Sequence, residues 1–87
     1  MNKIQDFITN NALDLSGQGS ELNGNCLLIA SYASYLKFDE DELIKNIEIL
    51  NLNRKSYLEI LRLFDYANKH NYAKVWKTED YKKKYIY

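Results

Sequence analysis

Three side chains in this sequence could take part in nucleophilic catalysis: Gln18, Cys26 and His70. A thiol attacks as a thiolate, so its pKa must be lowered by a helix N-terminus or a cation, and a histidine and an oxyanion donor complete the set. The chain has 1 cysteine and 1 histidine, so it holds at most one such set. A single cysteine also excludes an internal disulfide and is typical of a reducing compartment.

The motif NGNC, residues 23–26, stands at the head of an apolar segment and follows an upstream glutamine, Gln18. It resembles the nucleophile helix of papain-like cysteine peptidases, including the bacteriocin-processing type, over roughly residues 15–77. The resemblance implies a thiolate at Cys26, an oxyanion donor at Gln18 and a distant histidine. The sequence departs from that pattern at Leu27 and at His70, which ends a predicted helix. The peptidase alternative is therefore a relic or partial site, and we expect no enzyme activity.

Other motifs that could bind a metal ion or a phosphate have simpler interpretations. The acidic run 39–42 suits the first turn of a helix, and no histidine or second acidic cluster lies at ligand spacing. Gly17 and Gly19 lack the preceding strand and the following Lys-Ser/Thr of a phosphate-binding loop. We expect no metal ion and no cofactor.

The C-terminal part interleaves aromatic and basic residues, and we interpret it as a surface that binds another protein. Tyrosine and tryptophan bury a large area at low entropic cost and dominate interface hot spots. The predicted partner-binding residues are Tyr72, Lys74, Trp76, Lys77, Tyr81, Lys83 and Tyr85. Another interpretation is that most of these aromatic residues complete the core, which still leaves residues 82–84 exposed.

The alternative function is DNA binding through a helix-turn-helix or winged helix. Lys55, Arg62 and Lys69 recur every seven residues and form a basic stripe on the predicted helix 54–71. A C-terminal hairpin would form the wing, with Lys82 and Lys84 on phosphates. Protein binding is favoured because the pI is about 6.6 and acidic residues flank the stripe. Asp65 is expected to pair with Lys69, and Lys55 with Glu59, in a solvated face; only Asn68 is placed to read a base.

The segment Asn25 to Phe38 is apolar on nearly every side and is predicted to be the central helix. Cys26, Ala30 and Ala33 fall on one narrow stripe that lets a neighbouring helix approach closely. Asn23 or Asn25 is expected to cap the start of this helix, and the glycine-containing run 14–24 before it is expected to be a loop.

Three further helices are predicted around this segment. Residues 2–11 form a short amphipathic helix, and residues 39–50 form a helix with an acidic capping box at Asp39 and Glu42. The third is the amphipathic helix 54–71, with His70 at its C-terminus. Tyr72 to Tyr87 is expected to be a β-hairpin, or a last helix beginning at Thr78. The fold class is mainly α (α+β): four helices closed by a C-terminal hairpin, in a single domain over residues 1–87.

Composition describes a small globular protein with its charges divided along the chain. Residues 1–50 hold three lysines against eight acidic residues, 3 − 8 = −5, and residues 51–87 hold nine basic residues against four, 9 − 4 = +5. No signal peptide or membrane span is evident, so we expect a cytoplasmic protein without membrane contact, monomeric or homodimeric. The excess of Asn, Lys, Ile and Tyr, which have AT-rich codons, is consistent with a phage or mobile-element origin.

Overall fold

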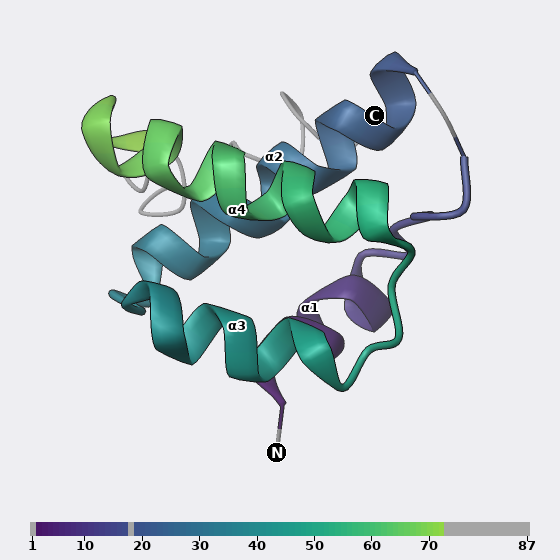
Figure 1. Ribbon diagram of the computed structural model, residues 1–87, viewed down its shortest axis with the longest axis horizontal. Coiled ribbons are helices and arrows are strands. Elements are labelled where there is room, and N and C mark those ends of the chain that lie inside the picture. Colours follow the sequence, from purple (N-terminus) through teal and green to yellow (C-terminus); the bar gives the residue numbers. More distant parts are fainter. Residues whose placement is uncertain (1, 18, 73–87) are drawn as a thin grey trace.

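The computed structural model describes residues 2–17 and 19–72, and these form a mainly helical protein. The helices are α1 (Lys3–Asn10), α2 (Ser20–Tyr35), α3 (Glu40–Glu48) and α4 (Arg54–Lys69). In Figure 1, α2 and α4 occupy the upper half of the molecule, and α1 and α3 occupy the lower half. The prediction of four helices is confirmed. The predicted C-terminal hairpin or final helix lies outside the described residues.

The central helix is α2, as predicted, but it begins earlier than the sequence suggested. Neither Asn23 nor Asn25 caps it: the N-cap is Gly19, with φ of 75° and no side-chain cap. The Asn25 amide instead donates to the Asp14 carbonyl oxygen at 2.8 Å and ties the preceding loop to the helix. Leu22 is buried at 1% exposure, so its burial extends the helix through residues that look like loop chemistry.

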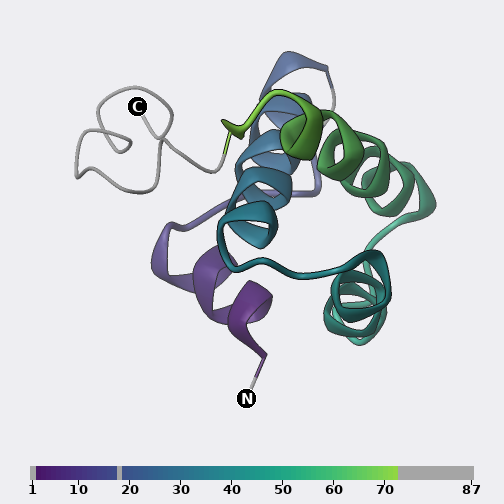
Figure 2. The same cartoon turned by 90° about the vertical axis from the view of Figure 1, so that its left-hand side faces the viewer.

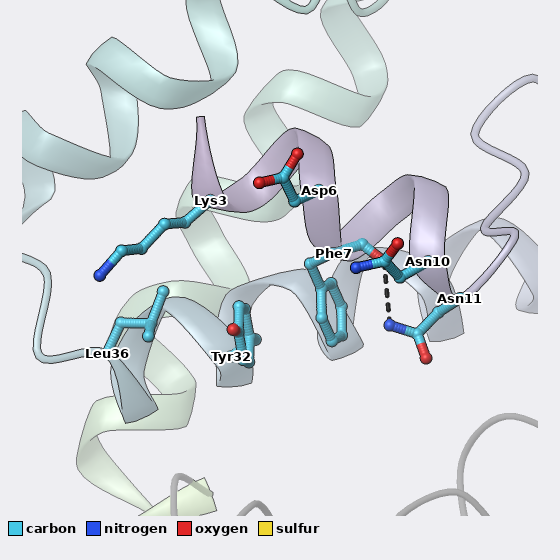
Figure 3. Close-up of a pocket in the computed structure, with 7 residues that line it drawn as sticks. All are labelled: Lys3, Asp6, Phe7, Asn10, Asn11, Tyr32 and Leu36. Carbon is cyan, nitrogen blue, oxygen red and sulfur yellow. Dashed lines mark hydrogen bonds between the residues drawn. The ribbon is translucent and has the colours of Figure 1, made fainter. Parts of the chain in front are cut away.

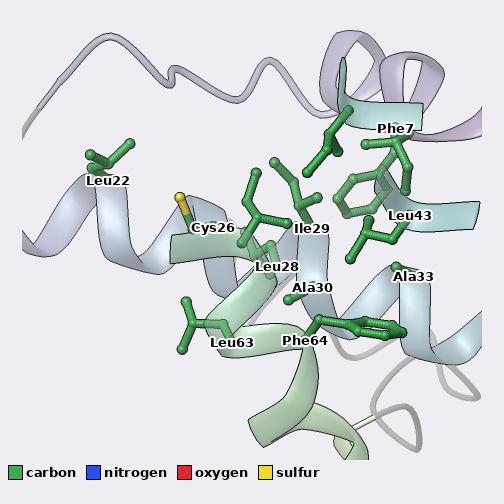
Figure 4. Packing of buried hydrophobic residues seen from close by; sticks show 13 residues of the cluster. Phe7, Leu22, Cys26, Leu28, Ile29, Ala30, Ala33, Leu43, Leu63 and Phe64 are labelled. Carbon is green, nitrogen blue, oxygen red and sulfur yellow. The ribbon is translucent and has the colours of Figure 1, made fainter. Parts of the chain in front are cut away.

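The main interhelical contact joins α2 to α4, and the small-residue stripe of α2 makes it possible (Figure 4). Cys26, Ala30 and Ala33 are fully buried there, and Ile60 and Ala67 of α4 are also fully buried. Small side chains allow two backbones to approach closely and leave room for larger neighbours to interdigitate. The prediction of a close helix–helix contact along this stripe is therefore confirmed.

Polar contacts fix the direction of α4 relative to α2. Ser56, buried in the first turn of α4, lies at the level of Cys26, whose Sγ is 4.0 Å from the Ser56 carbonyl oxygen. Near the other end of both helices, the Ser34 hydroxyl donates to Asn68 Oδ1 at 2.5 Å. The two helices therefore run in the same general direction, and their C-terminal ends lie at the same side of the molecule.

The shorter helices complete the core from below. α1 buries Ile4 and Phe7, and α3 buries Leu43 and Ile47. The expected capping box starts α3: Asp39 Oδ1 accepts from the Glu42 amide at 2.8 Å, and Glu42 Oε1 accepts from the Asp39 amide at 3.3 Å. The predicted acidic N-terminus of this helix is thus confirmed, and its acidic residues are explained by helix initiation.

Candidate functional site

An aromatic cluster lies at the C-terminal end of α4 and consists of Tyr66, His70 and Tyr72. The ring centroids of Tyr66 and His70 are 4.2 Å apart, and Tyr72 meets Tyr66 edge-on at 5.4 Å. The Tyr72 hydroxyl also donates to the Tyr66 hydroxyl oxygen at 3.5 Å. Tyr66 remains 41% exposed, so the cluster presents aromatic surface to solvent although its rings support one another.

The end of α4 builds this cluster from local geometry. Tyr66 and His70 are four residues apart and therefore share one helix face. His70 is the C-cap, as expected, and its amide donates to the Tyr66 carbonyl oxygen at 3.0 Å. Asn71 follows with φ of 53°, a left-handed conformation that asparagine tolerates and that often ends helices. This turn reverses the chain and brings Tyr72 back onto Tyr66.

Of the predicted partner-binding residues, only Tyr72 lies within the described part of the chain, where it belongs to the aromatic cluster. The others lie beyond it: Lys74, Trp76, Lys77, Tyr81, Lys83 and Tyr85. Lys82 and Lys84 of the DNA-binding alternative also lie beyond it. The sequence interpretation did not include Tyr66, although its four-residue spacing to His70 is a signal that could have found it.

The basic stripe of α4 is exposed, as predicted, but two of its three cations are paired. Arg62 Nε donates to Glu59 Oε1 at 2.6 Å, which raises the pKa of the guanidinium. Lys69 Nζ lies 3.1 Å from Asp65 Oδ2, so the predicted pairing of these two residues is confirmed. The expected pairing of Lys55 with Glu59 is wrong, because Glu59 is engaged by Arg62.

Asn68, the residue placed to read a base edge, is committed elsewhere. Its side-chain oxygen accepts the hydrogen bond from Ser34 and joins α4 to α2. Reading an adenine edge requires both the oxygen and the amide nitrogen of an asparagine. In this arrangement, DNA contact by Asn68 would require the loss of an interhelical hydrogen bond.

The three residues of the catalytic interpretation are not brought together by the described structure. Cys26 is fully buried seven residues into α2, so it is not at the helix N-terminus. Burial, with a smaller effect of Glu59, raises the pKa of the thiol to about 11. Cys26 packs at the level of Ser56, and His70 lies fourteen residues further along α4, about 21 Å at 1.5 Å per residue. Gln18 lies outside the described residues.

A pocket between α1 and α2 was not predicted from the sequence (Figure 3). Its volume is about 460 Å³, and one wall holds the rings of Phe7 and Tyr32, stacked with centroids 4.2 Å apart. Tyr35 extends this stack at 6.1 Å from Tyr32. The lining residues are Lys3, Asp6, Phe7, Asn10, Asn11, Tyr32 and Leu36. The pocket combines an aromatic wall with a rim that carries a cation, a carboxylate and two amides.

The structure contains neither a metal-binding cluster nor a membrane-spanning helix among its described residues. In residues 2–17 and 19–72, no three His, Cys, Asp or Glu side chains are grouped so that they could hold a metal ion. Over the same ranges, no helix combines the length and the hydropathy that a membrane crossing requires. Comparisons of the chain with family models, with curated proteins and with solved structures give no match.

Proposed function

We propose that this protein is a small non-catalytic regulator or inhibitor that acts by binding another protein. The observation that carries the proposal is the aromatic cluster of Tyr66, His70 and Tyr72, which is exposed at the end of α4. It continues in sequence into the aromatic and basic residues from Lys74 to Tyr85. A hairpin over these residues would extend the cluster into a larger surface with Trp76 and Tyr85.

The physical basis is the cost of ordering an interface. Side chains that are already held in place lose little entropy on binding, and rigid aromatic rings bury much area for two rotatable bonds. The contacts among Tyr66, His70 and Tyr72 preorganise the cluster in this sense. Lys69 stands beside the cluster and adds a charge at its rim, where charges steer association and specificity more than affinity.

The exposed tyrosines at the ends of α2 and α4 provide a matched test. We expect Tyr66→Ala to weaken partner binding at least tenfold, about 1.4 kcal/mol, as for an interface anchor. Tyr35→Ala is the control, because Tyr35 is 40% exposed, ends α2 and lies outside the cluster. The partner is identified by pull-down from nuclease-treated host lysate, and its affinity for each purified variant is measured by calorimetry.

Two outcomes would contradict protein binding through this surface. One is that nuclease-treated lysate yields no discrete partner, whereas untreated lysate yields nucleic acid. The other is that an identified partner binds Tyr66→Ala and Trp76→Ala as tightly as the wild-type protein. The second outcome would leave protein binding intact and would assign it to another surface.

The alternative, DNA binding, has support in the exposure of Lys55, Arg62 and Lys69 on one side of α4. Contacts of these residues with phosphates would release counterions, so affinity for a duplex would fall steeply as salt rises. Replacing all three by glutamine should then reduce the slope of log affinity against log salt by roughly three contacts' worth. A slope near zero for the wild-type protein would exclude this function.

The relic-peptidase alternative is less favoured, because Cys26 is buried with a raised thiol pKa and is remote from His70. Catalysis by a cysteine requires a thiolate that substrate can reach. Hydrolysis of a peptide library that disappears in Cys26→Ala, with the helical fold retained by circular dichroism, would restore this alternative and overturn the non-catalytic proposal.

A further inference from the structure

The α1–α2 pocket has the chemistry of a site for an indole ring. Phe7, Tyr32 and Leu36 offer aromatic and aliphatic surface to the body of a ring. An indole N–H is a donor without an acceptor function, and Asp6 and Asn10 carry acceptor oxygens at the rim. The lining also includes Lys3, whose ammonium group can lie over an aromatic face. A volume of about 460 Å³ is within the range of sites that enclose a ligand.

The described part of α4 ends close to α2, but on the side away from this pocket. The Ser34–Asn68 hydrogen bond places the C-terminal end of α4 against α2. Tyr32 is two residues from Ser34, about 200° around the helix at 3.6 residues per turn, so it faces the opposite way. Figure 2 shows the same arrangement, with α2 between α1 and α4. A chain leaving Tyr72 must therefore pass around α2 to reach the pocket.

The distance around α2 selects the residue that can make this contact. A helix with its side chains is about 10–12 Å across, and four extended residues span at most about 14 Å. Trp76 is the fourth residue after Tyr72 and the first aromatic residue beyond it. It is also the only tryptophan in the chain, and so the only side chain with an indole donor. Reach and ring chemistry thus identify the same residue.

We propose that Trp76 docks into the α1–α2 pocket and holds the C-terminal segment against the helical core. Charge complementarity supports this occupant. Trp76 lies between Lys74 and Lys77 in the part of the chain with net charge +5, whereas the pocket is formed by the part with net charge −5, and Asp6 stands at its rim. Because pocket and tryptophan belong to one chain, the contact benefits from a high effective concentration.

Docking has a regulatory consequence that rests on the proposed function. Trp76 is also one of the predicted partner-binding residues, so a partner that needs it must first displace it from the pocket. The apparent affinity is then reduced by the fraction of molecules in which Trp76 is released. A variant that blocks the pocket should bind the partner more tightly than the wild-type protein.

The test uses the fluorescence of the full chain, because Trp76 is the sole tryptophan emitter. We expect a blue-shifted emission maximum and acrylamide quenching several-fold weaker than for N-acetyltryptophanamide. Asn10→Phe places a bulky ring at the pocket and should shift the emission to the red and raise the quenching. Glu48→Phe is the matched control: both residues are exposed last residues of helices, and Glu48 does not line the pocket. It should leave the emission unchanged.

Each result decides the proposal. Wild-type emission and quenching equal to those of N-acetyltryptophanamide would overturn it. Blue-shifted emission that Asn10→Phe does not alter would place Trp76 elsewhere and would also overturn it, as would emission that shifts equally in Glu48→Phe. If Asn10→Phe loses its helical circular dichroism, nuclear Overhauser contacts between the Trp76 indole and the Tyr32 ring in the wild-type protein decide instead; their absence rejects docking.

The fluorescence test requires no partner, so its failure is separate from failure of the proposed function. Docking without any partner would leave the intramolecular contact and remove its regulatory meaning. Partner binding without docking would leave the function and remove the competition. Contacts from the pocket to Tyr81 in place of Trp76 would assign the site to another residue of the segment and refute the assignment made here.

Discussion

The thiol of Cys26 lies at the contact between α2 and the first turn of α4, where its Sγ is 4.0 Å from the Ser56 carbonyl oxygen. In the sequence, the same residue stands in a motif that resembles a peptidase nucleophile. The difference arises from burial: a thiolate at this position would lose its hydration, so the pKa rises to about 11. Residue type and spacing show which chemistry is available, and the environment decides whether it is used.

This environment predicts a pH dependence of stability. The folded-state thiol pKa of about 11 lies above the ordinary value of 9.0, so the folded protein holds the proton more tightly than the unfolded chain. The stabilisation is present below pH 9 and is lost as pH rises toward 11, with a loss of about 1.4 kcal/mol by pH 10. Urea unfolding of wild type and Cys26→Ala at pH 7–10 should show the stability difference shrinking, and a constant difference would argue against a buried thiol.

At the scale of the elements, the start of α2 shows where sequence patterns are insufficient. The glycines and polar residues of the run 14–24 are typical of a loop, yet the helix begins at Ser20. The periodicity of α4 and the capping box of α3 are local signals, so both helices could be predicted. The beginning of α2 depends on the burial of Leu22 in the core, which is a tertiary effect.

Two glycines at this helix start should respond to substitution in opposite directions. Gly24 lies inside α2 with no atom within 4 Å of an added Cβ, so Gly24→Ala should stabilise the protein by about 0.5–1 kcal/mol. Gly19 has φ of 75°, so Gly19→Ala should destabilise it by about 1 kcal/mol or more. Thermal unfolding of the two variants is the measurement. Equal changes of the same sign would show that α2 does not begin at Ser20.

The capping box of α3 gives a second prediction at this scale. Asp39→Ala removes the acceptor of the Glu42 amide and should cost about 1 kcal/mol of unfolding free energy. Asp41→Ala is the control, because Asp41 lies in the same first turn without a capping role, and its loss should cost a few tenths of a kcal/mol. Urea titration of both variants separates the hydrogen bond from the charge. Equal losses would assign the effect to charge alone.

For the whole molecule, the sequence was sufficient to predict four helices and a central apolar one, but not their mutual placement. The α1–α2 pocket exists because α1 crosses α2 next to Tyr32 and Leu36, and no local pattern encodes that crossing. The aromatic cluster was half predictable: Tyr72 was identified, whereas Tyr66 required the chain reversal at Asn71. Local spacing identifies helix faces, and their partners follow only from packing.

The packing order predicts where the molecule opens first. α2 and α4 share the main contact, whereas α1 has eight residues and two buried side chains. Amides of Ile29 to Ala33 and of Ile60 to Phe64 should exchange with deuterium only through global unfolding, and those of α1 through a local opening of lower free energy. Hydrogen exchange followed by NMR measures both. α1 amides as slow as those of α2 would mean that the four helices unfold as one unit.

The contact between Cys26 and Ser56 also has a consequence for synthesis on the ribosome. The apolar helix α2 is complete at Tyr35, but the helix that covers it ends at Lys69, 34 residues later (69 − 35 = 34). At about 5–20 residues per second, the nascent chain carries an uncovered α2 for roughly 2–7 s. During this interval its apolar surface is available to chaperones and to neighbouring nascent chains, so the translation of residues 36–69 sets the time during which this small protein can aggregate.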